Sequence, residues 1–293
     1  MKTERRGAQI AFFLAPIILV YGAFVYAPVL ATFALSGFRY DLLAPARFVG
    51  AGNFGALLSD PDILRAFRNT FALTIMLTLL HFVVGFALAL AVRGINKSLQ
   101  GVFRFFFYLP CILTTASVAI VWRYMANYHF GVLNWMLATI DLPAVRWTQS
   151  IGGAYTFIGI FSLWKFVGIY FLYFFIGLDA IQPSYYEAAE LEGANRVQIF
   201  FRVTVPMLTP TIFFVMLTLF VSAAQIFDEP YFLTNGGPQQ STETINLLIY
   251  RTAFQQFRLG EASALSILLF LVLLVFSLVQ VITSKRWVQY DAE

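Results

Sequence analysis

Few side chains in this sequence could do covalent or metal chemistry, and those few do not form a recognisable set. There is no G-x-x-x-x-G-K-[ST] phosphate loop, and His81 and His129 cannot form an H-E-x-x-H zinc site. The one cysteine, Cys111, excludes an internal disulfide framework, and in its apolar run after Pro110 it is interpreted as a small buried residue rather than a nucleophile. The sequence therefore predicts no catalytic residue, no metal site and no cofactor.

Polar side chains inside long apolar stretches offer a different chemistry, hydrogen bonding to a solute. Ionisable groups are costly at membrane depth and usually face a protein interior or a water-filled path. His81 and Lys165 each lie about half a helix length from either end of their apolar stretch, and Lys165 could offer a donor beside the aromatic face of Trp164. Each has two open interpretations, a residue that lines a solute path or a structural pairing.

Three more polar residues, Gln225, Asp228 and Glu229, come at the far end of a later apolar stretch. Their side chains could hydrogen-bond the hydroxyl groups of a solute, with Tyr170 or Tyr173 stacking against it. The alternative for these aromatic residues is ordinary packing between helices.

The elements that must position these residues are membrane helices. Hydrophobic residues make up 60% of the 293 and charged residues 12%, whereas soluble domains usually contain about a quarter charged residues. The net charge of +4 is dispersed, so the sequence has no basic patch for nucleic acid. Six apolar stretches are long enough for a span of about 20 residues. They are approximately residues 10–35, 67–92, 103–125, 154–178, 206–227 and 262–283.

The predicted fold is an all-α integral membrane protein with six transmembrane helices in a single domain, residues 1–293. The first stretch is interpreted as an uncleaved anchor, because it is too long for the apolar region of a signal peptide. Pro210 is expected to bend the fifth span, since proline has no N–H for the helix ladder. Six spans place both termini on one side, and the Lys and Arg residues near the helix ends indicate that this side is the cytoplasm.

A polar segment, residues 183–206, interrupts the apolar pattern between the fourth and fifth stretches. Ser184 and Glu187 have the spacing of a capping box, which predicts the start of a short helix. Gly193 can adopt the left-handed conformation that ends a helix. Two interpretations follow from these local features: a docking site for a partner, or a solvated helical loop whose glutamates balance the helix dipole.

The spacing within this segment resembles a known signature. It reads Glu187-Ala188-Ala189, three residues, Gly193, nine residues, then Val203-x-Val205-Pro206. This resembles the cytoplasmic loop of binding-protein-dependent ABC importer permeases, with valines where that family commonly has isoleucine and leucine. The resemblance covers essentially the whole chain and points to the first of the two paired permeases of the maltose-type sugar group. The other segments that carry it are residues 48–54, 108–110, 119–123, 233–238 and 241–244.

The resemblance implies a permease subunit that forms half of the path for a sugar or oligosaccharide in the inner (plasma) membrane of a prokaryote. Its implied partners are a second permease in a heterodimer, two ABC ATPases and an extracytoplasmic solute-binding protein. ATP hydrolysis is expected on the ATPases, so the chain is not itself an enzyme. The residues expected to dock in a groove of one ATPase are Glu187, Ala188, Ala189, Gly193 and Pro206.

Three other functions are weighed beside this one. The same machinery could import glycerol 3-phosphate or another polyol phosphate, because carriers of those solutes keep the same loops. A proton- or sodium-coupled secondary transporter would need inverted repeats and paired intramembrane acids, which are not found in the sequence. A six-span membrane enzyme would need a catalytic cluster, which is also not found.

Overall fold

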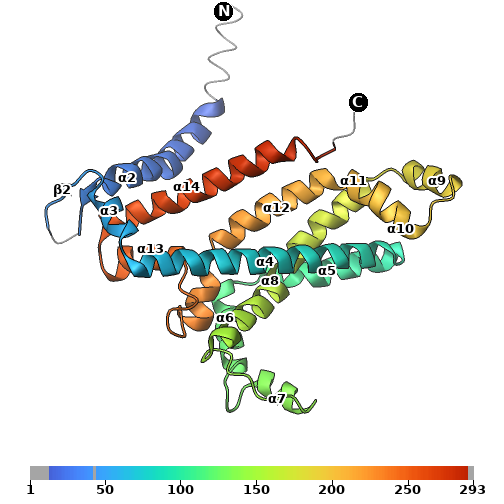
Figure 1. Ribbon diagram of the computed structural model, residues 1–293, viewed down its shortest axis with the longest axis horizontal. Helices are drawn as coiled ribbons and strands as arrows, with labels where there is room; N and C mark the ends of the chain where they lie inside the picture. The colour runs from blue at the N-terminus through green and yellow to red at the C-terminus, as the bar shows by residue number, and fades with distance from the viewer. Residues whose placement is uncertain (1–12, 42–43, 290–293) are drawn as a thin grey trace, which may run out of the picture. The chain divides into compact units, whose positions relative to one another are not determined.

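The structure is a computed structural model that describes residues 13–41 and 44–289. The basic N-terminal flank and residues 10–12 of the first predicted span lie outside the described residues. The described chain is mainly helical and contains one two-stranded antiparallel sheet (Figure 1). It divides into two compact units, Met1–Ile63 with Leu248–Leu271 (unit 1) and Leu64–Leu247 with Val272–Glu293 (unit 2).

Between four and six helical segments of the described chain could cross a membrane. Four single helices are long and apolar enough, namely Phe13–Ser36, Pro61–Arg93, Ile151–Ala180 and Leu259–Ser284. Two bent helix pairs also qualify: Lys97–Ile112 with Thr115–Met125, bent by 93°, and Arg196–Met207 with Thr209–Ala224, bent by 64°. The number of spans is six if each bent pair is one span, as the sequence predicts.

The third predicted span, residues 103–125, is therefore not one straight helix. Its helix begins earlier, at Lys97, and breaks where Leu113 and Thr114 adopt extended backbone angles. The bend in the fifth span lies at Leu208, close to the predicted position at Pro210. Pro210 cannot donate to the Pro206 carbonyl, and the Thr209 hydroxyl donates to that oxygen instead at 2.7 Å.

Unit 1 is built on the N-terminal helix and the first half of the C-terminal helix. Its elements are η1 (Gly22–Tyr26), α2 (Ala27–Ser36), β1 (Phe38–Arg39), β2 (Arg47–Phe48), α3 (Gly52–Leu58), the start of α4 (Pro61–Arg93), the end of α13 (Ile245–Tyr250), all of η4 (Arg251–Gln255) and the first part of α14 (Leu259–Ser284). Strands β1 and β2 pair with Phe38 opposite Phe48. The loop that the sequence shows after the first span is thus a hairpin followed by a short helix.

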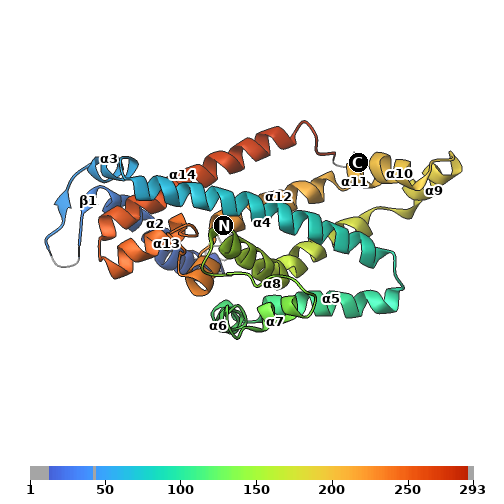
Figure 2. The same cartoon turned by 60° about the horizontal axis from the view of Figure 1, so that its bottom comes forward.

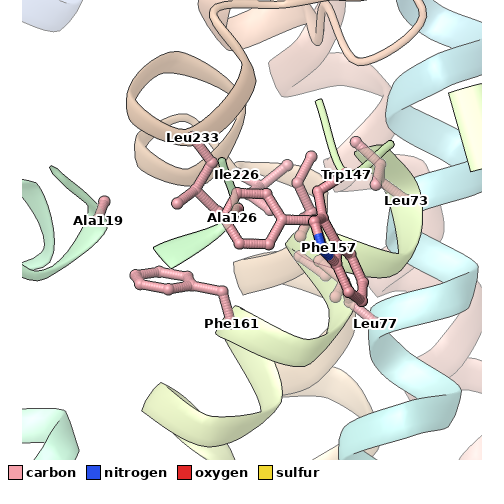
Figure 3. Packing of buried hydrophobic residues seen from close by; sticks show 11 residues of the cluster. Leu73, Leu77, Ala119, Ala126, Trp147, Phe157, Phe161, Ile226 and Leu233 are labelled. Carbon is pink, nitrogen blue, oxygen red and sulfur yellow. The ribbon is translucent and has the colours of Figure 1, made fainter. Parts of the chain in front are cut away.

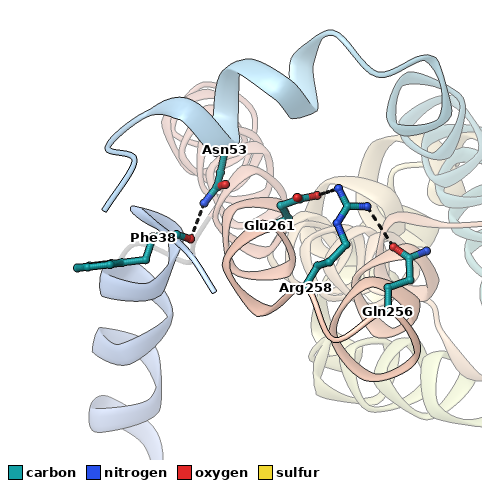
Figure 4. Close-up of polar contacts among 5 residues, drawn as sticks. All are labelled: Phe38, Asn53, Gln256, Arg258 and Glu261. Atoms are coloured by element: carbon teal, nitrogen blue, oxygen red, sulfur yellow. Dashed lines mark hydrogen bonds and ion pairs between the residues drawn. The ribbon is translucent and has the colours of Figure 1, made fainter. Parts of the chain in front are cut away.

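Polar contacts fasten this hairpin within unit 1 (Figure 4). The buried Asn53 amide donates to the carbonyls of Ser36 and Phe38, at 2.8 and 2.9 Å. Arg258 forms an ion pair with Glu261 and donates to the Gln256 amide oxygen at 3.3 Å. The two Asn53 bonds satisfy backbone carbonyls that a loop would otherwise leave open, and the Arg258 contacts join side chains of unit 1.

Unit 2 holds most of the helices. Its elements are the rest of α4, then α5 (Lys97–Ile112), α6 (Thr115–Met125), α7 (Val132–Ala138), α8 (Ile151–Ala180), α9 (Pro183–Leu191), α10 (Arg196–Ile199), η2 (Phe200–Thr204), α11 (Val205–Met207), α12 (Thr209–Ala224), η3 (Pro230–Thr234), the start of α13 and the end of α14. Helix α8 is central, because α5, α12 and η3 all contact it. The hairpin of α9 and α10 lies at one end of unit 2 (Figures 1 and 2).

Two clusters of buried apolar side chains form the core of unit 2. The first includes Leu73, Leu77, Trp147, Phe157 and Phe161 (Figure 3). The second lies toward the carboxyl ends of α4 and α8, and its members are Ala89, Val92, Tyr170, Phe171, Phe174, Phe175, Leu178, Ile181, Leu208, Val215 and Leu219. Dense aromatic packing of this kind fixes the helices that carry the polar residues.

Glycine allows α5 and α8 to approach each other closely. A Cβ atom at Gly168 on α8 would lie 2.0 Å from the Phe107 carbonyl oxygen on α5. No larger residue fits there without moving a backbone. The broken span is therefore held tightly against α8.

Candidate functional site

A cavity of about 410 Å³ in unit 2 gathers most of the polar residues that the sequence places at membrane depth. It is lined by α4, α8, α12 and the segment that follows α12. The lining residues are Leu77, His81, Ser162, Phe166, Ile169, Tyr170, Leu219, Ser222, Ala223, Gln225, Ile226, Phe227, Asp228 and Glu229. A mainly apolar wall with a few converging polar groups is typical of small-molecule sites.

His81 forms the α4 side of the cavity and is fixed on both ring nitrogens. Nδ1 lies 2.7 Å from the Leu77 carbonyl oxygen and Nε2 lies 3.1 Å from the Ser162 carbonyl oxygen on α8. The ring of His81 also packs edge-on against Tyr170, with 5.4 Å between centroids. His81 is thus both a lining residue and a structural tie between α4 and α8.

The segment after α12 brings the acidic groups. Glu229 is only 6% exposed, and burial raises the pKa of its carboxyl to about 7, with the neighbouring Asp228 adding to the rise. Backbone contacts hold this segment in place, because Asn246 donates to the Gln225 carbonyl at 2.6 Å and Thr244 to the Ile226 carbonyl at 3.0 Å. The protonated Glu229 can donate a hydrogen bond as well as accept one.

Lys165 and Trp164 do not line the cavity. Lys165 is 1% exposed, and its ammonium donates to the carbonyl oxygens of Pro110 at 3.2 Å and Leu113 at 2.5 Å. These carbonyls belong to Pro110 in the last turn of α5 and to its C-cap residue Leu113, where the helix ladder ends. The Trp164 ring packs against Trp122 at 5.3 Å, and Tyr173 packs against Tyr170 and Phe214. The structure thus gives Lys165 a structural partner at the helix break.

Several lining residues are not among those the sequence singles out. Ser162, Phe166 and Ile169 follow one another at helical spacing, so they share one face of α8 with Tyr170, which the sequence does single out. Because this stretch is apolar on every side, it has no polar face, and the sequence does not show which face of the helix points inward. The signal that was available is the isolated hydroxyl of Ser162, and likewise that of Ser222 three residues before Gln225.

The polar segment 183–206 forms a separate feature, a helical hairpin. Helix α9 begins at Pro183 after an N-cap at Gln182, and no side chain caps it. The predicted capping box from Ser184 to Glu187 is therefore wrong, because Pro183 itself takes the first helical position. A capping box does occur at the next helix, where Asn195 and Gln198 bond reciprocally.

The remaining predicted docking residues of the hairpin differ in backbone conformation and exposure. Gly193 adopts φ +81 with nothing within 4 Å of an added Cβ, so the predicted left-handed end of the helix is confirmed. Glu187 and Ala188 are exposed, Ala189 is half-buried, and Pro206 lies in α11. The small side chains leave the backbone of α9 accessible to a partner surface.

The chain belongs to the family of binding-protein-dependent transport system inner membrane components, which matches residues 82–289. The probable ABC transporter permease protein YesP of Bacillus subtilis is 34% identical over 288 residues, which cover 96% of this chain and 92% of that protein. The trehalose/maltose transport system permease protein MalF of Thermococcus litoralis is 31% identical over 283 residues, 95% of this chain and 94% of that protein.

A solved structure has the same fold. It is the crystal structure of a bacterial ABC transporter involved in the import of the acidic polysaccharide alginate, with a TM-score of 0.86 and 25% identity over 98% of this chain and 99% of the matched chain. The family and these relatives make the chain a membrane permease component of an ABC transporter.

Proposed function

We propose that the chain is one of two permease subunits of an ATP-driven importer, and that its cavity is part of the path for a sugar or oligosaccharide. The observation that carries the proposal is the placement of cavity and hairpin on the same helices. Helices α8 and α12 both line the cavity, and the hairpin joins the end of α8 to the start of α12. A displacement of the hairpin can therefore reach the cavity wall through α8 and α12, the two helices that it connects.

The hairpin is proposed to dock on an ATPase in the cytoplasm. Besides Glu187 and the small residues of α9, it carries an exposed apolar side chain, since Leu191 is 90% exposed and lies outside every candidate span. An exposed apolar residue beside charged ones outside the membrane spans favours a protein interface. Six spans then place both termini in the cytoplasm, in a single transmembrane domain in the inner (plasma) membrane of a prokaryote.

The cavity favours a neutral, hydroxyl-rich solute. Carboxyl, amide, hydroxyl and imidazole groups can exchange hydrogen bonds with sugar hydroxyls, and Tyr170, Phe166 and Phe227 offer aromatic faces. No Lys or Arg is among the lining residues in the described part of the chain. A negative charge about 4 Å from a carboxylate costs about 4 kcal/mol at an effective dielectric of about 20, so Asp228 disfavours glycerol 3-phosphate and other polyol phosphates.

The proposed partners follow from the proposed function as an importer permease. They are a second permease in a heterodimer, two ABC ATPases that hydrolyse ATP, and an extracytoplasmic solute-binding protein. Two relatives support the sugar class: a multiple sugar-binding transport system permease protein of Streptococcus mutans and a lactose transport system permease protein of Rhizobium radiobacter are each 29% identical to this chain.

Purification of the tagged chain from its native membranes tests the machinery. An ATPase and a second permease are expected to co-purify, and solute uptake by this chain alone would overturn the proposal. Equilibrium binding to the cognate solute-binding protein tests the cargo. Neutral sugars are expected to bind more tightly than their phosphorylated counterparts, and the reverse order would move the assignment to polyol phosphates.

A further inference from the structure

One contact joins the hairpin to a helix that is not its neighbour in sequence. The Arg93 guanidinium, at the last residue of α4, donates to the Tyr186 hydroxyl on α9 at 2.9 Å. The same guanidinium lies 4.9 Å from the centroid of the Tyr186 ring. The Thr204 hydroxyl, in η2, lies 3.4 Å from the Tyr186 hydroxyl. Tyr186 therefore contacts α4 and both arms of the hairpin.

The surroundings of Tyr186 make this contact firm. Its ring packs against the buried cluster that contains Val92, Leu178 and Ile181, so one residue of α9 reaches into the core of unit 2. Thr204 is itself buried. The two residues on either side of Tyr186 differ from it, since Tyr185 and Glu187 are both exposed. Within α9, Tyr186 thus faces inward while its neighbours face solvent.

Helix α4 has a special place among the three helices that line the cavity. Helices α8 and α12 are joined covalently to the hairpin, whereas α4 ends at Arg93 and continues into α5. His81 and Leu77, on the same unbroken helix, form the α4 part of the cavity wall. Arg93 and His81 are 12 residues apart, which is about 18 Å of helix. A rigid α4 can therefore carry a displacement from Arg93 to the cavity.

We propose that Tyr186 is a positioning residue that makes α4 move with the hairpin. A displacement of the hairpin would then move all three helices that line the cavity, α4, α8 and α12, instead of α8 and α12 alone. The Tyr186 hydroxyl and ring hold Arg93, and Thr204 ties the second arm of the hairpin to the same hydroxyl. The proposal rests on the proposed docking of the hairpin on an ATPase. It adds a role for two residues that do not themselves have to touch the ATPase or the solute.

The test compares Tyr186→Phe, which removes the hydroxyl and keeps the ring, with Tyr185→Phe, the same change at the exposed neighbour. The transporter is purified with its ATPases and second permease and reconstituted in liposomes with its solute-binding protein. Three quantities are measured: the amount of ATPase retained, basal ATP hydrolysis, and the stimulation of hydrolysis by loaded binding protein. The loss of one hydrogen bond to a charged donor changes an equilibrium constant by about tenfold.

Tyr186→Phe is expected to retain the ATPase and to lower the stimulation by about tenfold, while Tyr185→Phe behaves as wild type. Arg93→Met is expected to lower stimulation similarly, Arg93→Lys to restore most of it, and the double variant Arg93→Met with Tyr186→Phe to be no worse than either alone. Wild-type stimulation in Tyr186→Phe would overturn the proposal, as would additive losses in the double variant. If Tyr186→Phe released the ATPase, Tyr186 would be a docking residue and the positioning role would be refuted. Failure of the wild-type chain to retain any ATPase would instead refute the docking of the hairpin.

Discussion

Replacing Glu229 by glutamine is expected to stabilise the protein at pH 8 and to have little effect at acidic pH. Burial raises the pKa of this carboxyl from 4.5 to about 7. Each tenfold change in proton affinity is worth about 1.4 kcal/mol, so the ionised form costs the folded state about 3 kcal/mol. Glutamine keeps the shape and hydrogen-bonding groups of the protonated acid and does not ionise.

The pH window follows from the direction of the shift. Below pH 4.5 the carboxyl holds its proton in the folded and the unfolded chain, so Glu229 carries no penalty there. As the pH rises, the unfolded chain ionises first, and the folded state loses relative stability until about pH 7. Above that value the penalty is constant. The advantage of glutamine is therefore largest at pH 8 and small at pH 5.

Thermal unfolding of the purified transporter in one detergent, followed by tryptophan fluorescence at pH 5 and pH 8, measures this effect. The melting temperature of Glu229→Gln is expected to exceed that of wild type by about 6 °C or more at pH 8 and by much less at pH 5. Glu192→Gln, which removes an exposed carboxylate, is the matched control. Because Asp228 adds to the raised pKa of Glu229, Asp228→Asn should reduce the difference. An equal gain at both pH values would refute the assignment of a buried, protonated Glu229.

Three further substitutions test the other structural claims. Lys165→Met should lower stability by about 3 kcal/mol, because two carbonyls at the helix break each lose a charge-assisted hydrogen bond of about 1.5 kcal/mol or more; an unchanged unfolding midpoint would contradict this. Gly168→Ala should destabilise the chain by about 1–3 kcal/mol, because the added Cβ meets the Phe107 carbonyl. Gly152→Ala is the control, because an added Cβ there lies in open space and should not destabilise the chain. Equal melting temperatures of the two variants would count against the close approach of α5 and α8. Gly193→Val should reduce ATPase co-purification without affecting membrane insertion, since a β-branched residue is strained at φ +81; normal solute-stimulated hydrolysis would argue against docking.

Features set by local chemistry could be predicted from the sequence. Gly193 ends its helix in the left-handed conformation because the requirement acts on that residue alone. The bend near Pro210 likewise follows from one missing N–H group. The capping box at Ser184 failed for an equally local reason, since Pro183 fits the first helical turn and moves the N-cap to Gln182.

The break between α5 and α6 could not be predicted, because its cause is distant in sequence. The apolar pattern continues through Leu113 and Thr114, and residues 103–125 have the composition of one span. Two carbonyls at the break accept hydrogen bonds from Lys165, which comes more than 50 residues later on α8. Sequence periodicity reports which faces are apolar, but not which side chain arrives from another helix.

The polar residues that line the cavity could be predicted from the sequence, but the apolar residues that line it could not. His81 and Tyr170 converge on it because polar groups in a membrane helix usually face an interior, and Gln225, Asp228 and Glu229 reach it from the segment after α12. Trp164 and Lys165 lie on the same helix as Tyr170 but at other angles around it. An all-apolar helix such as α8 gives no contrast by which these directions could be told apart.

The position of Lys165 also keeps its ammonium group out of the cavity, where Asp228 and Glu229 lie. An ammonium that faced Asp228 or Glu229 would form an ion pair and neutralise the wall, and an anionic solute could then approach. Lys165 instead donates to Pro110 and Leu113, and in the described part of the chain it forms no ion pair with either acid. The Lys165 side chain thus stabilises the helix break and adds no positive charge to the cavity wall.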